Sequence, residues 1–314
     1  MGHGERVVAF LSSTGVIFYW RMLPKEQILR RGACSVEADS WTEWLHEIRR
    51  IEFVRTMRYV PLGPDSTVLE LGCGDGFQID LLRGRFRHVF AVDPEAIPDS
   101  RAGFARCVAE ALPFPDRFFD LVISSNVAEH LTDRQRGMEE VRRVMRPGGY
   151  AAHVVPTRTW KFTSLALNPL GYPLRVIEKW HARQRLRHDA AGTGPARLCK
   201  LPSPGMMQVL GRCFFPPIHG TFSSHMAEFR SYGGQQWMQT FALQGFKFVA
   251  ELPLLFYTPF GFCRFRLVPQ RVWAAHHGFA STRAFIFQVV TSSPEIGVLP
   301  ANRGAELTGT LGHT

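Results

Sequence analysis

Cysteine is sparse in this sequence and follows no pattern. The 314 residues contain six cysteines without a Cys-x-x-Cys pair, and no histidine cluster stands near them at zinc spacing (Cys34, Cys73, Cys107, Cys199, Cys213, Cys263). This scatter indicates neither a disulfide framework nor a structural metal site. We therefore expect no bound metal and, most simply, a reduced, cytoplasmic setting.

An apolar run long enough to cross a bilayer is also missing. The most apolar early stretch, Val7 to Trp20, is broken by Ser12-Ser13-Thr14-Gly15. It is shorter than the roughly 20 apolar residues of a membrane-spanning helix. No small-residue cleavage site follows it, and Arg6 stands where a myristoylation signal has Ser or Thr. The sequence thus predicts neither a spanning helix nor a leader peptide.

Acidic residues are scarce in one region of a chain whose net charge is +10. Between Thr157 and Ser231 there are eleven Lys or Arg but only three acids, Glu178, Asp189 and Glu228. Residues 175–188 read as a basic amphipathic helix, which can lie on an anionic membrane surface or bind phosphate. The alternative interpretation is a solvated face over a small apolar seam.

What the sequence does contain is a strand, a glycine-rich loop and a helix start within residues 68–77. The apolar run Val68 to Leu71 leads into Gly72, Gly74 and Gly76. Glycine allows positive φ and close approach of a ligand to the backbone. We expect the amide hydrogens of this loop to face a ligand at the helix N-terminus, near Gln78.

A second signal lies about 20 residues further on. Val89 to Asp93 reads as a buried strand ending in a carboxylate, at the spacing of a ribose-binding acid in a βαβ nucleotide site. The dinucleotide fingerprint Gly-x-Gly-x-x-Gly would need its third glycine at Phe77. The two signals therefore predict a nucleoside site of another kind.

The loop Gly72-x-Gly74-x-Gly76, with Glu70 before it, Asp93 after it and Arg146-Pro147-Gly148-Gly149 further on, resembles the class I S-adenosylmethionine-dependent methyltransferases. The nearest group is the broad small-molecule family called methyltransferase type 11. The likeness is specific over residues 65 to about 156 and looser in the C-terminal third. It implies an α/β fold with a Rossmann-like, doubly wound, seven-stranded and mostly parallel sheet. The last strand is antiparallel, an N-terminal helix precedes the sheet, and a lid is inserted.

The element signals divide the chain into five segments. The first, 1–62, holds strand-like runs that suggest a hairpin (Val7–Leu11, Val16–Trp20) and a leading helix from Ser40 to about Met57. That helix either lines the pocket or only covers the sheet. The others are the cofactor-binding core, a basic aromatic insert acting as acceptor lid, a closing helix with antiparallel strands, and a disordered tail (63–156, 157–231, 232–291, 292–314).

The resemblance implies S-adenosyl-L-methionine as cofactor and a set of binding residues. Asp93 should take both ribose hydroxyls, and Glu70 either orients the loop and contacts the methionine part or only caps turn amides. Ala109 and Glu110 are carried over for the adenine, although Val108 stands where many members have aspartate. The full set is Glu70, Gly72, Cys73, Gly74, Gly76, Asp93, Pro94, Ala109, Glu110, Asn126 and Val127.

Candidate catalytic residues follow from the need for a base if the acceptor is a hydroxyl or carboxyl group. His130 resembles the family histidine after the fourth strand, which usually packs near the cofactor and does not act as base. His219 and Glu228, with His225 nearby, form a His/acid cluster in the insert; the alternative is surface histidines beside a helix-capping acid. The stretch Asn126 to Leu131 should face the transferable methyl group.

The leading hypothesis is methyl transfer to a small-molecule or lipid- or glycan-linked acceptor, including one with an anionic group. An alternative is a nucleic-acid methyltransferase, suggested by the basic insert. Against it, Ser125-Asn126-Val127-Ala128 lacks the Asn/Asp-Pro-Pro-aromatic signature, so a nucleic acid is less expected. A second alternative is a non-catalytic binding protein with the cofactor fold. Peripheral contact with the inner face of a membrane through 175–188 is one further expectation.

Overall fold

The computed structural model describes residues 7–11, 17–21, 40–95, 103–190, 211–214, 216–218, 222–242, 245–258 and 267–290. The predicted disordered tail and the candidate His219 lie outside these ranges. Among these residues, no helix is both long enough and apolar enough to cross a bilayer.

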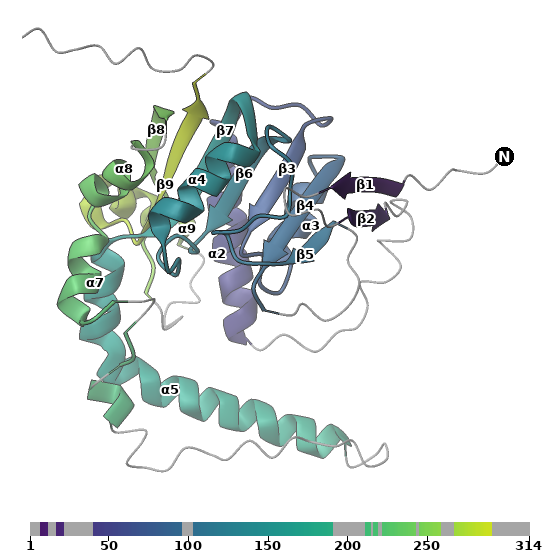
Figure 1. The fold of residues 1–314 in the computed structure, drawn as a ribbon. Coiled ribbons are helices and arrows are strands. Elements are labelled where there is room, and N and C mark those ends of the chain that lie inside the picture. The colour runs from purple at the N-terminus through teal and green to yellow at the C-terminus, as the bar shows by residue number, and fades with distance from the viewer. Residues whose placement is uncertain are drawn as a thin grey trace, which may run out of the picture.

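A seven-stranded sheet forms the centre of the molecule (Figure 1). Its strand order is β5-β4-β3-β6-β7-β9-β8, and β9 alone runs antiparallel to its neighbours. The fold class predicted from the sequence is confirmed. The strands are β3 Thr67–Leu71, β4 His88–Asp93, β5 Phe104–Arg106, β6 Phe119–Ser125, β7 Met145–Pro156, β8 Phe246–Pro253 and β9 Thr282–Val289.

Helices cover both faces of the sheet because its strands are apolar on both sides. Alternate side chains point to opposite faces, so Val68 packs with α2 and α3 while Leu69 packs with α4 and α8. The helices are α2 Ser40–Met57, α3 Phe77–Arg83, α4 Arg134–Val144 and α8 Gly234–Ala242. A further helix, α9 Val268–Ala274, continues into the π-helical turn η1 Ala275–Phe279.

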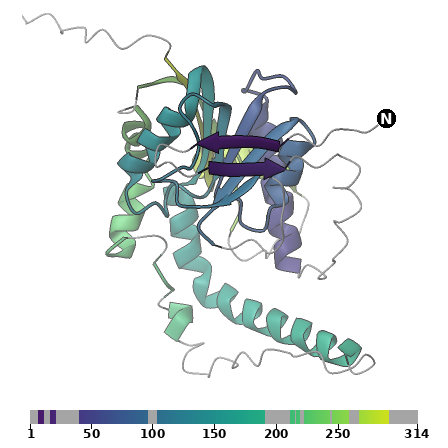
Figure 2. The same cartoon turned by 45° about the vertical axis from the view of Figure 1, so that its right-hand side comes forward.

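Helix α4 carries standard helix signals at both of its ends. Asp133 caps it by accepting a hydrogen bond from the Arg136 amide at 3.0 Å, and Arg142 and Arg143 occupy the last turn, where they complement the helix dipole. The predicted helix that begins at Ser40 is confirmed. The N-terminal hairpin is also confirmed, since β1 Val7–Leu11 pairs antiparallel with β2 Ile17–Arg21 (Figure 2).

The insert departs most from expectation. Helix α5 spans Arg158–Ala190, 33 residues, and extends away from the sheet (Figures 1 and 2). The sequence indicated a helix over 175–188 only, because Pro169 and Pro173 fall inside α5 and proline removes a helical hydrogen bond. Helix α7, His225–Ser231, joins α5 through the buried ion pair of Lys161 with Glu228. Membrane contact by residues 175–188 stays a prediction.

We expect Phe241→Ala to lower the free energy of unfolding by about 3–5 kcal/mol, because a fully buried phenylalanine leaves a cavity. Phe241 stacks on His153 at 4.7 Å and lies 4.9 Å from Phe287, measured between ring centroids. Urea unfolding followed by circular dichroism measures the change. Phe279→Ala, at a side chain 57% exposed, is the control and should cost under about 0.5 kcal/mol. Equal losses in the two variants would contradict the assignment of Phe241 to the core.

Candidate active site

The glycine loop links β3 to α3 through backbone conformations that favour glycine. The φ angles are 67° at Gly72, 51° at Gly74 and 83° at Gly76. A Cβ at Gly72 would overlap the Cγ2 methyl of Val127, which follows β6. The loop therefore packs directly against the end of the neighbouring strand.

The loop amides are used within the protein. Gly72 and Cys73 donate to the Val92 carbonyl at 2.8 and 3.3 Å, and Gly76 donates to the Cys73 carbonyl at 2.8 Å. The Gly74 amide donates to Asp93 Oδ2 at 2.9 Å. The expectation that these amides face a ligand is wrong, because neighbouring backbone and Asp93 occupy them. What the loop offers a ligand is a surface without Cβ atoms.

Asp93 ends β4 beside this loop. Its Oδ2 accepts from Gly74 and its Oδ1 accepts from the Glu95 amide at 2.9 Å. These two bonds hold the carboxylate at the carboxyl edge of the sheet, where open α/β sheets bind ligands. The carbonyl of the next residue, Pro94, accepts from Arg106 Nε at 3.0 Å.

Glu70 lies within β3, 2% exposed. Its Oε2 has no hydrogen-bond partner among the described residues. Burial raises the pKa of this carboxyl to about 8, and the nearby carboxylates of Asp75, Asp80 and Asp93 add to the rise. Arg49 opposes the rise. Four acids thus gather at the mouth of the loop.

The side chains of two other predicted cofactor residues, Cys73 and Glu110, make contacts within the protein. The Cys73 side chain is buried in the core beneath the loop. The Glu110 carboxylate accepts from the amides of Thr132 and Asp133 at 2.9 and 3.3 Å, so it is engaged at the start of α4. Ala109 beside it is buried. Binding of the adenine by the backbone of Ala109 and Glu110 stays a prediction.

Asn126 directly follows β6, with φ of 52°. Its amide donates to the Val154 carbonyl at 2.8 Å, and its side-chain oxygen accepts from Arg49, with Nη1 at 2.6 Å. Asn126 thus joins the strand end to helix α2. Val127, the next residue, covers Gly72.

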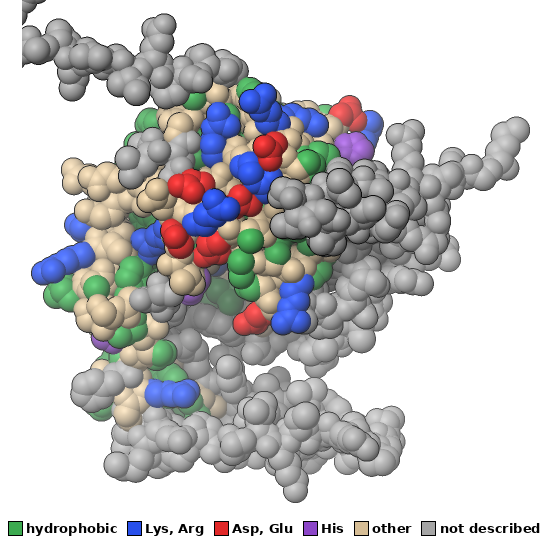
Figure 3. Space-filling model, in the orientation of Figure 1, with side chains coloured by type: hydrophobic (Ala, Val, Ile, Leu, Met, Phe, Trp, Pro, Cys, Tyr) green, Lys and Arg blue, Asp and Glu red, His purple; other side chains and the backbone are tan. Residues whose placement is uncertain are grey.

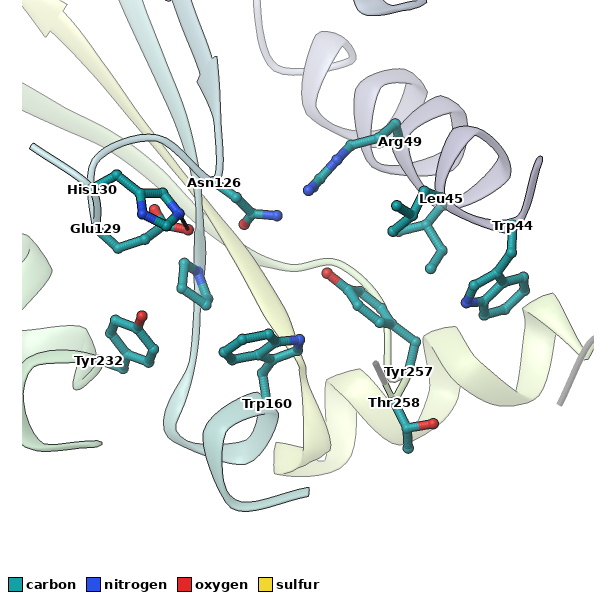
Figure 4. Close-up of a pocket in the computed structure, with 12 residues that line it drawn as sticks. Trp44, Leu45, Arg49, Asn126, Glu129, His130, Trp160, Tyr232, Tyr257 and Thr258 are labelled. Atoms are coloured by element: carbon teal, nitrogen blue, oxygen red, sulfur yellow. Dashed lines mark ion pairs between the residues drawn. The ribbon is translucent and has the colours of Figure 1, made fainter. Parts of the chain in front are cut away.

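A pocket of about 160 Å³ opens beyond this strand end (Figure 4). Helix α2, residues following β6, and the segments 156–160 and 257–258 surround it. Aromatic rings make much of its wall. The described residues that line it are Trp44, Leu45, Ile48, Arg49, Asn126, Glu129, His130, Pro156, Trp160, Tyr232, Tyr257 and Thr258. Of the two interpretations of α2, pocket lining is confirmed.

The structure separates the candidate catalytic residues. His130 lines the pocket, and burial lowers its pKa. Glu228 is fully buried and forms an ion pair with Lys161, whose Nζ also lies 3.0 Å from His225 Nδ1. Glu228 therefore ties α5 to α7, and its catalytic role stays a prediction. Among the described residues, no group of three or more His, Cys, Asp or Glu side chains could hold a metal ion.

Comparison with known proteins identifies the core. A family model described as a methyltransferase domain matches residues 69–153. A probable S-adenosylmethionine-dependent methyltransferase of Mycobacterium tuberculosis is 38% identical over 110 residues, 32% of this chain and 40% of the relative. Residues 69–153 of the chain form a methyltransferase domain.

Other similar proteins share this domain. An uncharacterized methyltransferase of Mycolicibacterium gilvum is 43% identical over 94 residues, 27% of this chain and 37% of the relative. The chain thus spans about 37–40% of the length of these curated relatives. A methyltransferase structure from Mesorhizobium loti has 13% identity and a TM-score of 0.45 over 76% of this chain and 97% of its own. A geranyl diphosphate C-methyltransferase from Streptomyces coelicolor has 14% identity and a TM-score of 0.45. The match covers 83% of this chain and 88% of that chain.

The residues of the methyltransferase domain fit the family cofactor. Gly72 leaves a surface that a Cβ would fill, and Asp93 is fixed at the strand end. Glu70 has a buried oxygen without a partner, and Asp75 and Asp80 lie near it. A concentration of carboxylates suits a cofactor that carries a sulfonium and an ammonium group.

Sequence reasoning missed several pocket residues of the domain. Trp44 and Arg49 sit on the face of α2 that the apolar periodicity marked, but nothing in the sequence tells which of its residues reach a ligand. Glu129 lay inside the stretch expected to face the methyl group and was not singled out. Tyr232 follows α7 and had no signal of its own.

We expect Gly72→Ala to weaken binding of S-adenosylhomocysteine about tenfold or more. The added Cβ would displace Val127 and force a non-glycine residue into positive φ, at a cost of roughly 1–2 kcal/mol. Isothermal titration calorimetry measures the affinity. Gly63→Ala is the matched control, because no atom lies within 4 Å of its Cβ position. Unchanged affinity in Gly72→Ala would contradict the close approach.

We expect the melting temperature of the ligand-free protein to fall between pH 5 and 9, and to fall less in Glu70→Gln. The folded pKa of about 8 exceeds the ordinary 4.5, so the folded state binds more protons than the unfolded state in that window. Stability therefore decreases as pH rises. Differential scanning fluorimetry measures the slope, with Glu43→Gln at an exposed site as control. Parallel slopes in wild type and Glu70→Gln would refute the shift.

Proposed function

We propose that this protein transfers a methyl group from S-adenosylmethionine to a small-molecule or lipid- or glycan-linked acceptor held in the pocket beyond β6. The observation that carries the proposal is the position of that pocket. Asn126 belongs to its wall, and the next residue, Val127, packs on Gly72 of the cofactor loop. An acceptor in the pocket would thus adjoin the cofactor mouth.

The protein's contribution to such a reaction is placement. The cofactor supplies a methyl group on a positively charged sulfur. Asp93 would hold the ribose hydroxyls, and the glycine loop would let the cofactor approach the backbone. Trp44, Trp160 and other apolar wall residues would exclude water, which favours in-line displacement.

The basic insert supports a lid role. Trp160 lies at the start of α5 and Tyr232 directly follows α7, and both line the pocket. The segment 157–231 therefore contributes Trp160 to the wall, and Tyr232 adjoins its other end. This placement favours the insert as the part that encloses the acceptor.

A nucleic-acid acceptor receives less support. Positive and negative side chains are interspersed over the face that carries α4 (Figure 3). Several are ion-paired there, including Arg143 with Asp116 and Glu140, and Arg146 with Asp120. A mixed surface lacks the one-sign field that attracts a phosphate backbone.

Two measurements test the proposed function. The wild type should bind S-adenosylhomocysteine in calorimetry, and Asp93→Ala should weaken that binding about tenfold or more, because it removes charge-assisted hydrogen bonds worth roughly 1.5–3 kcal/mol. Asp65→Ala, at an exposed side chain paired with Arg87, is the control. Transfer of label from methyl-labelled cofactor to a panel of small acceptors should then be detectable.

The outcomes separate the three candidate functions. Absence of cofactor-product binding would remove the enzyme hypothesis. Tight binding without transfer to any acceptor would favour the non-catalytic alternative. A steep salt dependence of RNA binding, together with labelled RNA, would favour the nucleic-acid alternative.

A further inference from the structure

Glu129 presents an unusual carboxyl group to the pocket. It follows β6 and is 4% exposed. Its Oε2 has no hydrogen-bond partner within the described ranges, and its Oε1 lies 4.0 Å from His130 Nε2. A buried carboxyl oxygen without a partner costs free energy unless a ligand donates to it. In Figure 4 the side chain stands on the wall beside Asn126 and His130.

The charged groups around Glu129 define what that ligand can be. Arg49 of α2 and Arg134 of α4 act on it as cations, and Glu228 of α7 acts as an anion that Lys161 already neutralises. An ammonium group here would face two guanidinium groups, and an anion would face the carboxylate itself. A neutral donor meets neither repulsion.

Tyr232 completes this end of the pocket. Its hydroxyl points towards Glu129 and His130 (Figure 4). Burial raises its pKa well above the ordinary value, and the carboxylates of Glu129 and Glu228 raise it further. Tyr232 therefore stays protonated and cannot serve as the base. It is suited to donate a hydrogen bond to an acceptor oxygen.

The walls favour a flat apolar acceptor. Trp44, Trp160 and Tyr257 contribute aromatic rings, and Ile48 and Pro156 contribute apolar surface. A volume of about 160 Å³ is comparable to cavities that hold one benzene ring. The pocket thus combines an aromatic enclosure with one carboxyl group among its described lining residues.

We propose that Glu129 is the general base of an O-methylation, and that the acceptor is a neutral hydroxyl group on a small aromatic compound. This inference rests on the proposed function. The hydroxyl proton passes to Glu129 while the oxygen bonds to the methyl carbon, and the carbon–sulfur bond breaks with its electron pair staying on sulfur. The proton then leaves through His130, whose side chain is 51% exposed.

The ionisation of Glu129 supports this role. Burial raises its pKa to about 7, and Arg49 and Arg134 limit the rise. A base with a pKa near the working pH is partly ionised and still takes up a proton readily. Activity should therefore rise with pH through about 7, as the carboxylate form becomes populated.

Binding tests the acceptor class without turnover. With S-adenosylhomocysteine present, calorimetry compares phenol with anisole and 2-naphthol with 2-methoxynaphthalene; benzylamine and benzoate serve as charged counterparts. We expect a hydroxyl compound to bind the wild type about tenfold more tightly than its methyl ether. Glu129→Leu should abolish this preference, whereas Glu129→Gln should retain most of it, because an amide oxygen still accepts a hydrogen bond.

Kinetics on a hydroxyl compound that is methylated tests the base. Glu129→Gln should lower kcat about a hundredfold or more, lose the rise in kcat/KM near pH 7, and keep the affinity for S-adenosylhomocysteine within twofold. His130→Asn should keep the pH dependence. Glu139→Gln, at an acid on α4 away from the pocket lining, is the matched control and should leave rate and profile unchanged.

Each result decides one question. If the wild type binds no S-adenosylhomocysteine, the proposed function fails. If it binds and methylates only amines or carboxylates, or if Glu129→Gln keeps the wild-type rate and profile, the base assignment is overturned while the proposed function stands. Equal binding of every hydroxyl compound and its ether, including no binding of any, would also overturn it.

Discussion

The architecture of the pocket depends on one partly buried cation, Arg49. Its guanidinium donates to Glu52 at 2.9 Å and to the Asn126 side chain at 2.6 Å, and Glu52 in turn accepts from Thr282 on β9. This network fastens α2 to the ends of two strands. Because an unpaired buried charge is costly, removing any one partner would leave the others uncompensated. The face of α2 that carries Trp44 is thereby fixed over the pocket.

The glycine loop and the pocket beyond β6 are connected through one packing contact. Gly72 directly follows β3, and Val127 follows β6, the strand beside it in the sheet. Because parallel strands end at the same edge, residues after each strand converge there. The positive φ of Asn126 turns the chain so that Val127 covers the loop while Glu129 reaches the pocket wall. A single packing contact thus relates the two sites.

The sequence predicted the features that arise from local pattern and missed those that arise from distant partners. The strands before the glycine loop and before Asp93 followed from apolar runs, and the seven-stranded, mostly parallel sheet came from the family resemblance. Helix α5 was truncated in the prediction, since its prolines satisfy local rules for a break and tertiary structure overrides them. Glu228 read as a catalytic candidate or a helix-capping acid, because Lys161, which neutralises it, lies 67 residues earlier. Arg49 and Glu129 likewise acquire their character only from neighbours on other elements.

The strong positive charge of the insert does not extend to the reacting end of the pocket. Lys161 is neutralised by Glu228, and Arg158 is directed to the backbone carbonyls of Phe229 and Arg230 at the surface. At the pocket wall, Arg49 is paired with Glu52, and Arg49 and Arg134 act on Glu129 as cations. Net charge therefore describes the outer surface of this protein, whereas Glu129 supplies the one carboxyl group among the described residues that line the pocket.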